Sequence, residues 1–339
     1  MDRKGISFFV VGLAVGLVLA TAGFSWVLRS QNISGDQGRV RVLKLAHGLD
    51  QSHPVHLGMV YMAKRLDELS NGTMKIEIFP NGKLGNEVDC VEQLQRAALE
   101  MSKVSTAVLE GFIPEMAVFS MPYIFRDEEH YWTVLKGPVG KELLQIGETR
   151  GLHGLCYYDS GSRNFYTVGK PILTPADLAG KKIRVMKSAT SMEMVRTLGG
   201  APTPVAWGEL YTALQQGQVD GAENNPPSFY TNRHYEVCKY FSMDEHTRIP
   251  DILLVSTVCW DSLTARQQQW FQQAADESVE EQRRLWTEMT ADALEQVQKY
   301  GVEIYYPDKQ PFVDKVQPMH ARYEGTPVGA LMQRIKEVE

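Results

Sequence analysis

The chain has 339 residues, of which 43% are hydrophobic and 22% are charged, and its formal net charge is −6. This composition is typical of a globular protein, and the length is enough for about two domains with sizeable cores. Because 41 acidic residues outnumber 35 Lys and Arg, no basic excess favours a nucleic-acid partner. Four cysteines are too few for a fold built on disulfides.

The N-terminal segment from Ile6 to Leu28 contains no charged residue and is flanked by basic residues. Its length at ~1.5 Å per residue is enough to cross a membrane, which favours an anchor. Ala20-Thr21-Ala22, however, fits a signal-peptide cleavage pattern. We therefore predict a signal peptide or membrane anchor over 1–28 and a polar linker over 29–40. Either alternative places the rest of the chain outside the cytoplasm, free or tethered to the membrane.

The four cysteines would then lie in an oxidising compartment. Cys90, Cys156, Cys238 and Cys259 form no CxxC pair, and their wide spacing has no metal signature. One interpretation is that they are small buried hydrophobic residues. A disulfide between Cys238 and Cys259 is the alternative.

The first elements of the mature chain alternate between strand and helix. Residues 40–46 form a β-rich run, and apolar residues then recur at helical spacing up to Leu69, where Asn71-Gly72 ends the helix. Alternation over 74–78 predicts a second strand, and 88–94 a second helix. This order indicates an α/β domain with a largely parallel sheet.

The pattern resumes after the small-residue junction Asp159 to Ser162. Thr174 and Pro175 are typical of a helix N-cap and first helical position. The remaining periodicities predict strands over 183–186, 219–222 and 252–258, and helices over 192–198 and 208–216.

One long segment, Ala265 to Tyr300, contains neither glycine nor proline and follows a capping box at Thr264 to Gln267. As one helix, its thirty-six residues would extend roughly 54 Å, which exceeds a small domain. We predict a helix that crosses two domains, with two shorter helices as the alternative.

No motif points to catalysis. The chain has no GxSxG elbow, P-loop or GxGxxG sequence, so we assign no catalytic residue and no cofactor. His53 and His56 are spaced as metal ligands could be, but a helix-capping role fits this turn better, and we assign no metal.

Three polar positions are candidates for ligand binding. Arg163 follows the junction, Arg184 lies inside the strand 183–186, and Asp220 to Pro226 lies at the carboxyl end of a strand, where α/β sheets bind ligands. A guanidinium matches a carboxylate in bidentate geometry. A strand arginine that simply faces water is the alternative.

Together these residues resemble the substrate-binding protein of tripartite ATP-independent periplasmic (TRAP) transporters. The resemblance covers roughly residues 42–325. It rests on four blocks in the family's order and spacing: FPNGKLGNE at 79–87, MPYIF at 121–125, TPADLAGKKIRV at 174–185 and PVAWGELYTALQQGQVDGAEN at 204–224.

The resemblance implies a two-domain α/β fold like that of periplasmic binding proteins, with hinge strands, a ligand cleft and a long helix spanning both domains. By this likeness, domain I holds 41–160 and 250–289, and domain II holds 161–249 and 290–339. Hinge closure around an organic acid would let the monomeric receptor dock on the small and large permease subunits for ion-driven uptake.

The resemblance also implies roles for individual residues. Arg184 matches the arginine that grips the ligand carboxylate, and Arg163 a second cationic contact. Asn224 matches a hydrogen-bonding asparagine, and Trp207 a ring that stacks beside the ligand. The remaining candidates are Glu87 for ligand hydroxyls, Ser105 where sialic-acid-binding members carry glutamate, and His47 and His246 near the cleft.

The ring and the hydroxyl partners favour a polyhydroxylated acid. We expect a hexuronate or aldonate sugar acid, with a C4-dicarboxylate or keto acid as the alternative. Ser105 argues against sialic acid. Two other classes remain open: a sensory protein that uses the same cleft, and an extracytoplasmic enzyme, which the missing nucleophile–base pair disfavours.

Overall fold

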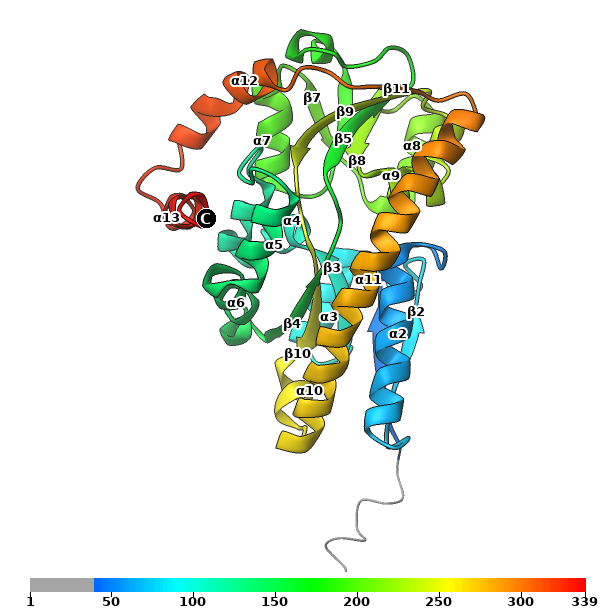
Figure 1. The fold of residues 1–339 in the computed structure, drawn as a ribbon, viewed down its shortest axis with the longest axis vertical. Coiled ribbons are helices and arrows are strands. Elements are labelled where there is room, and N and C mark those ends of the chain that lie inside the picture. The colour runs from blue at the N-terminus through cyan, green and yellow to red at the C-terminus, as the bar shows by residue number, and fades with distance from the viewer. Residues whose placement is uncertain (1–39) are drawn as a thin grey trace, which may run out of the picture.

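The computed structural model describes residues 40–339, which form two bodies stacked along the long axis of the molecule (Figure 1). The predicted signal or anchor over 1–28 lies outside the described residues, as does the predicted linker apart from Val40. Among the helices of residues 40–339, none combines the length and the apolar character that a membrane span needs.

The first sheet forms the lower body in Figure 1 and has five strands in the order β2-β1-β3-β10-β4. The strands are β1 (Arg41–Ala46), β2 (Met74–Phe79), β3 (Met101–Ser105), β4 (Leu152–Tyr158) and β10 (Asp251–Ser256). The second sheet has six strands in the order β11-β9-β5-β8-β6-β7. They are β5 (Arg163–Thr167), β6 (Lys182–Val185), β7 (Ala201–Pro204), β8 (Gly221–Asn224), β9 (Tyr240–Thr247) and β11 (Glu303–Tyr305).

Each sheet is parallel except for one strand. β10 runs antiparallel to both β3 and β4, and β5 runs antiparallel to both β8 and β9. These two are the strands that enter from the other body, because β4 continues into β5 and β9 continues into β10. The predicted parallel pattern therefore holds apart from the two crossing strands, which link the bodies as the predicted hinge strands.

The long helix predicted from the sequence is continuous. α11 (Ala265–Lys299) has 35 residues, and its N-terminus carries the predicted capping box between Thr264 and Gln267. Its length of roughly 52 Å lets it lie along both bodies, against α2 and β4 in the first and α9 in the second (Figure 1). The alternative of two shorter helices is therefore wrong.

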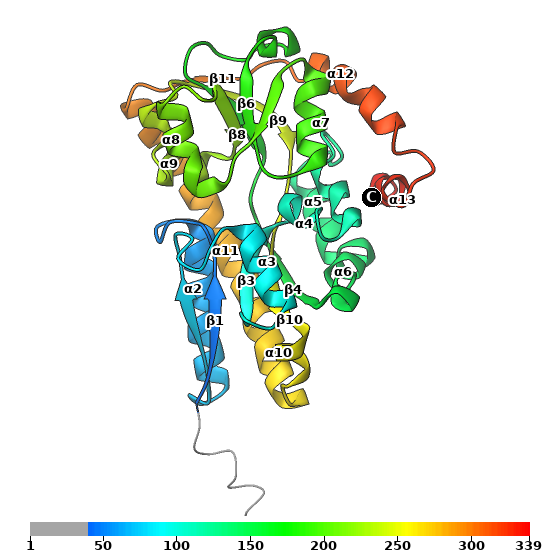
Figure 2. The ribbon, with the colours of Figure 1, turned by 180° about the vertical axis from the view of Figure 1, so that it is seen from behind.

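The helices of the first body surround its sheet. They are α2 (Pro54–Leu69), α3 (Glu87–Gln95), α4 (Thr106–Leu109), α5 (Glu128–Lys136), α6 (Pro138–Gln145) and α10 (Thr257–Asp261), with 3₁₀ helices η1 (Pro114–Ser120) and η2 (Glu148–Arg150). Seen from behind in Figure 2, α3 lies beside β3 just below the boundary between the bodies. The amino end of α3 and the carboxyl end of β3 therefore face the second body.

Between β5 and β9, the second body has three α-helices and three 3₁₀ helices. They are α7 (Ala189–Leu198), α8 (Leu210–Gln215) and α9 (Pro226–Thr231), with 3₁₀ helices η3 (Pro175–Leu178), η4 (Trp207–Glu209) and η5 (His234–Glu236). Thr174 is the N-cap of η3 as predicted, and Asp177 accepts from its backbone N, but the element is a single 3₁₀ turn rather than an α-helix.

Local signals in the sequence explain several element ends. The side chain of His53 caps α2 by accepting from the backbone N of Val55, so the capping interpretation is confirmed for His53, whereas His56 lies within the helix and contacts His47. Asn71 and Gly72, with φ of 51° and 81°, turn the chain out of that helix. Gly217, with φ of 67°, similarly closes α8, so the chain re-enters the sheet two residues later than predicted.

The C-terminal segment returns from one body to the other. α12 (Gln310–Ala321) packs on α7 of the second body, whereas α13 (Pro327–Lys336) packs on η1 and α6 of the first. These contacts group α13 with the first body, although the predicted domain II includes it. The other domain boundaries stay a prediction.

All four cysteines are buried and free. Cys238 lies in the core cluster on the outer side of the second sheet, with Tyr166 and Phe241, whereas Cys259 lies in the core of the first body. The two side chains belong to different cores, so the alternative of a Cys238–Cys259 disulfide is wrong.

Candidate functional site

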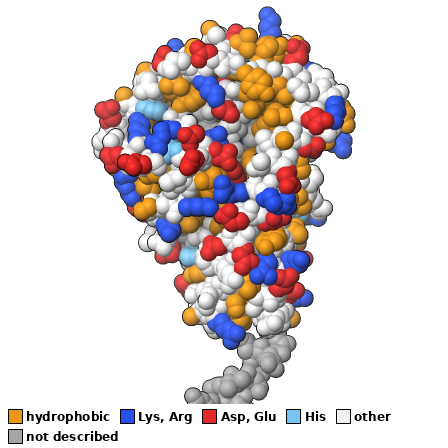
Figure 3. Space-filling model, in the orientation of Figure 1, with side chains coloured by type: hydrophobic (Ala, Val, Ile, Leu, Met, Phe, Trp, Pro, Cys, Tyr) orange, Lys and Arg blue, Asp and Glu red, His pale blue; other side chains and the backbone are white. Residues whose placement is uncertain are grey.

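A cavity of ≈ 360 Å³ lies between the two bodies and is lined by residues from both. Six of the predicted ligand residues line it: Glu87, Ser105, Arg163, Arg184, Trp207 and Asn224. The side chains of His47 and His246 are not among its lining residues. Outside the cavity, acidic and basic side chains are interspersed over the face in Figure 3.

Arg184 on β6 is buried, with 2% of its surface exposed. Its Nε donates to the carbonyl O of Val205 at 2.9 Å, and its guanidinium lies 5.7 Å from the ring centroid of Trp207. The Nη1 atom has no hydrogen-bond partner among the described residues. Burial lowers the pKa of Arg184, because removal from water disfavours the charged guanidinium, and the carboxylates of Glu223 and Glu87 do not offset this. A ligand carboxylate would supply an anionic partner.

Arg163, at the start of β5, is already paired. Its Nε and Nη2 bind the carboxylate of Glu223 on β8, and Nη1 donates to Oδ1 of Asn224 at 2.9 Å. Although burial by itself raises it, the charge and hydrogen bonds of Arg163 and the charge of His246 lower the pKa of Glu223 to about 2. Arg163 therefore brings less free positive charge to the cavity than Arg184 does.

Glu223 is the partner that the sequence interpretation missed. The signal was present, since it lies inside the quoted Asp220 to Pro226 segment, directly before Asn224. Its pairing with Arg163 joins residues 60 positions apart, which sequence spacing does not reveal. Asn224 accepts from Arg163 and from the backbone N of Asn225 through Oδ1, which leaves its Nδ2 to donate to a ligand.

His246 lies behind this pair rather than in the cavity wall. Its Nδ1 is 2.7 Å from Oδ2 of Asp244, and its Nε2 is 3.5 Å from Oε2 of Glu223. Burial alone would lower the pKa of His246, but the carboxylates of Asp244 and Glu223 raise it to about 9. The imidazolium thus supports Glu223, which in turn holds Arg163.

His47 also lies behind the wall. Its Nε2 is 3.0 Å from Nδ1 of His56, and its Nδ1 accepts from the backbone N of Leu49 at 3.1 Å. Burial and nearby positive charge lower the pKa of His47 to about 2, so the ring is neutral. Its acceptor bond shapes the turn at Gly48 and Leu49, both of which line the cavity.

Trp207 enters the cavity from the single turn η4. Its ring packs edge-on against His234, with centroids 5.1 Å apart, and faces the guanidinium of Arg184. The indole Nε1 has no hydrogen-bond partner among the described residues. The ring therefore offers an apolar face to a ligand.

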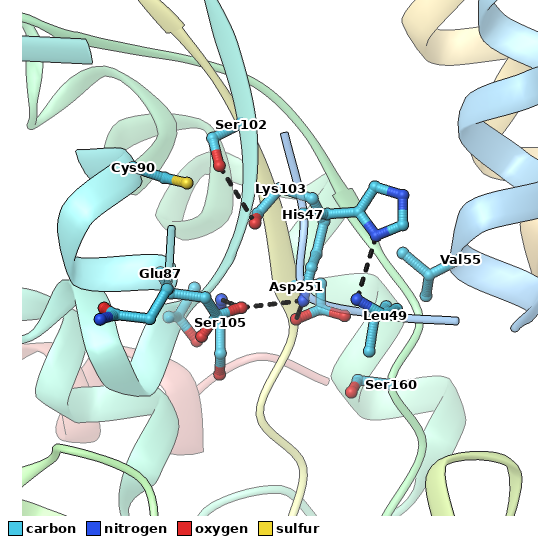
Figure 4. Close-up of polar contacts among 12 residues, drawn as sticks. His47, Leu49, Val55, Glu87, Cys90, Ser102, Lys103, Ser105, Ser160 and Asp251 are labelled. Carbon is cyan, nitrogen blue, oxygen red and sulfur yellow. Dashed lines mark hydrogen bonds and ion pairs between the residues drawn. The ribbon is translucent and has the colours of Figure 1, made fainter. Parts of the chain in front are cut away.

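The first body contributes a cluster of charged side chains, shown in Figure 4. Lys103 on β3 donates to Oε1 of Glu87 at 2.9 Å and to Oδ1 of Asp251 at 3.2 Å. The backbone N of Ser105 also donates to Oε1 of Glu87, at 3.1 Å. Sequence reasoning missed Lys103 and Asp251, although a lysine within the strand Met101–Ser105 is an unusual charge for a buried run.

The geometry suits the reversible capture of a small organic acid. A cation without an anionic partner faces the cavity, and hydrogen-bonding groups from both bodies surround it. Among residues 40–339, no group of three or more His, Cys, Asp or Glu side chains is arranged to hold a metal ion.

This chain is similar to known proteins, and two of the solved ones hold a small organic acid. The protein YiiZ of Salmonella typhimurium is 40% identical over 298 residues, which cover 87% of this chain and 91% of YiiZ. A TRAP periplasmic solute-binding protein from Bradyrhizobium, solved with galacturonate, superposes with a TM-score of 0.85 at 39% identity and covers 88% of this chain and 100% of that one. A Pseudomonas putida TRAP protein with D-glucuronate has a TM-score of 0.85 at 34% identity, covering 88% and 97%.

Residues 45–326 match the family described as bacterial extracellular solute-binding protein, family 7. The match covers most of the chain, including every residue that lines the cavity and all strands of both sheets except the start of β1. The chain therefore belongs to this family, the solute-binding receptors of TRAP transporters.

Proposed function

We propose that this chain captures a sugar acid, a hexuronate or an aldonate, in the cavity between its two bodies and delivers it to a membrane permease. The observation that carries the proposal is Arg184, a buried guanidinium in the wall of that cavity whose Nη1 has no hydrogen-bond partner among the described residues. The bound galacturonate and glucuronate of the two solved relatives support a sugar acid as the ligand.

The ligand would be held from both sides. Arg184, Trp207 and Asn224 belong to the second body, and Glu87 and Ser105 to the first. A sugar acid that binds both groups draws the bodies together, because its contacts are complete only when they are close. The carboxylate would pair with Arg184, and the hydroxyls would exchange hydrogen bonds with the other residues.

The crossing strands would act as the hinge. At the junction, Gln282 of α11 accepts from the backbone N of Asp159 at 2.8 Å and donates to its carbonyl O at 2.9 Å. Gln282 is fully buried, so these bonds hold the β4–β5 crossing against α11. The long helix thereby gives both bodies a common support during closure.

Membership of the family supports the proposed location and partners. The chain would be exported, with 1–28 either removed or retained as an anchor. The closed monomer would dock on the small and large permease subunits, and an ion gradient would drive uptake. It would release its ligand chemically unchanged, as a receptor and not an enzyme. N-terminal sequencing of the protein recovered from periplasm and membrane would separate cleavage from anchoring.

A thermal-shift panel tests the proposed ligand class. The purified protein is mixed with D-galacturonate, D-glucuronate, D-galactonate or D-erythronate, and separately with succinate, malate or pyruvate. A ligand at ~100 times its dissociation constant stabilises the folded state by about 2.7 kcal/mol, so a true ligand raises Tm. Sugar acids should raise Tm, and the Arg184→Ala variant should lose the shift. A shift with only dicarboxylates or pyruvate would refute the proposal.

A further inference from the structure

The carboxylate–lysine cluster of Glu87, Lys103 and Asp251 forms one wall of the cavity (Figure 4). Its side chains are 17%, 4% and 7% exposed, respectively. The three come from the start of α3, the middle of β3 and the start of β10. In the antiparallel register Asp251 lies opposite Ser105 and Leu253 opposite Lys103, which places Asp251 and Lys103 on the same face.

The cluster has a net charge of −1, from one ammonium and two carboxylates. Lys103 uses two of its three N–H groups on Glu87 and Asp251, which leaves one to donate. Lys103 binds Oε1 of Glu87 and Oδ1 of Asp251. The second carboxylate oxygen of each residue, Oε2 of Glu87 and Oδ2 of Asp251, makes no hydrogen bond to the described residues. This wall therefore offers a single donor and two carboxylate acceptors.

The wall from the second body has the opposite character. There Arg184 brings an unpartnered guanidinium, and Arg163 is neutralised by Glu223. A ligand carboxylate is therefore attracted to Arg184. Hydroxyl groups, which both donate and accept, match the free donor and acceptors of the carboxylate–lysine cluster. A second carboxylate on the ligand would meet two negative charges there and find one N–H.

We infer that the carboxylate–lysine cluster determines specificity, selecting acids with one carboxylate and several hydroxyls and excluding dicarboxylates. Like charges brought together in a water-poor cavity are costly, so exclusion needs no steric block. The inference rests on the proposed function, since it concerns the far end of the same ligand.

The test compares two acyclic ligands and a cyclic one. D-galactonate and galactarate have the same carbon chain and differ only in a terminal CH₂OH or carboxylate, and D-galacturonate adds a pyranose form. Calorimetry measures their dissociation constants with the wild type and with Glu87→Gln and Asp251→Asn. Each substitution keeps the shape, removes one negative charge and leaves Lys103 one carboxylate partner. Glu92→Gln, on the exposed face of the same α3, is the matched control.

We expect the wild type to bind its preferred monocarboxylate at least ~10-fold more tightly than galactarate. Glu87→Gln and Asp251→Asn should each move that ratio at least ~10-fold toward galactarate, whereas Glu92→Gln should leave it unchanged. Equal wild-type affinities, or an unchanged ratio in both variants, would overturn the inference and leave the proposed function standing. Failure of the wild type to bind any of the sugar acids would overturn the proposed function itself. Circular dichroism of each variant confirms that it is folded.

Discussion

Replacement of Arg184 by lysine should weaken ligand binding while the positive charge stays in place. The guanidinium lies in the cavity wall and is fixed there by the bond from Nε to Val205 and by the ring of Trp207, so its orientation is defined. Lysine offers a point charge on a flexible stem and cannot bind a carboxylate in the bidentate manner. It also leaves the Val205 carbonyl without this donor.

The expected loss can be worked from these contacts. A hydrogen bond to a charged group contributes roughly 1.5–3 kcal/mol, and the substitution removes one such bond to the ligand. At about 1.4 kcal/mol per factor of ten, the dissociation constant should rise about 10- to 150-fold. Because the cation stays, binding should weaken rather than vanish, in contrast to Arg184→Ala.

Calorimetric titration with D-galacturonate, or with the sugar acid that gives the largest thermal shift, measures the change. Arg196→Lys is the matched control, since Arg196 lies on α7 of the same body with an exposed side chain. Its affinity should equal that of the wild type. If Arg184→Lys binds within about twofold of the wild type, the bidentate interpretation of Arg184 is refuted.

Two further predictions concern closure and pH. Glu110, after α4 of the first body, accepts from Ser188 Oγ at 2.6 Å and from the N and Oγ1 of Thr190 at 3.1 and 3.0 Å, across the boundary. Glu110→Ala removes these bonds and should weaken ligand affinity about 10-fold without touching the ligand, as measured by calorimetry. Separately, His246 has a raised pKa of about 9 against 6.5 unfolded, so its stabilisation is complete below pH 6.5. As the pH rises from 6.5 to 9, the free energy of unfolding measured in urea should fall by up to roughly 3 kcal/mol.

Each of these predictions has its own control. The control for Glu110→Ala is Glu92→Ala, a change on an exposed face of the first body that should leave ligand affinity at the wild-type value. If Glu110→Ala also binds ligand as tightly as the wild type, the cross-boundary role of Glu110 is contradicted. His246→Gln should unfold with a free energy that changes little from pH 6.5 to 9. A wild-type free energy that stays constant over that range would show that the pKa of His246 is not raised.

Local structure followed closely from local sequence. The run from Ala265 lacks glycine and proline and carries its own cap, so one helix forms wherever the rest of the chain lies. Asn71-Gly72 and Gly217 end helices because their backbones adopt left-handed φ. Arg184 could be singled out because a charged residue in a buried strand calls for an explanation.

The pairing of the charged side chains around the ligand cavity could not be predicted from the sequence in the same way. Lys103 meets Glu87 and Asp251 across 16 and 148 residues, and Arg163 meets Glu223 across 60. Such pairings depend on how the strands are ordered in each sheet, and no local pattern encodes that order. Periodicity and caps therefore define the helices and strands, and the packing of the two bodies decides which charges are neutralised. The free cation at Arg184 and the paired one at Arg163 look alike in the sequence and differ only in what lies beside them.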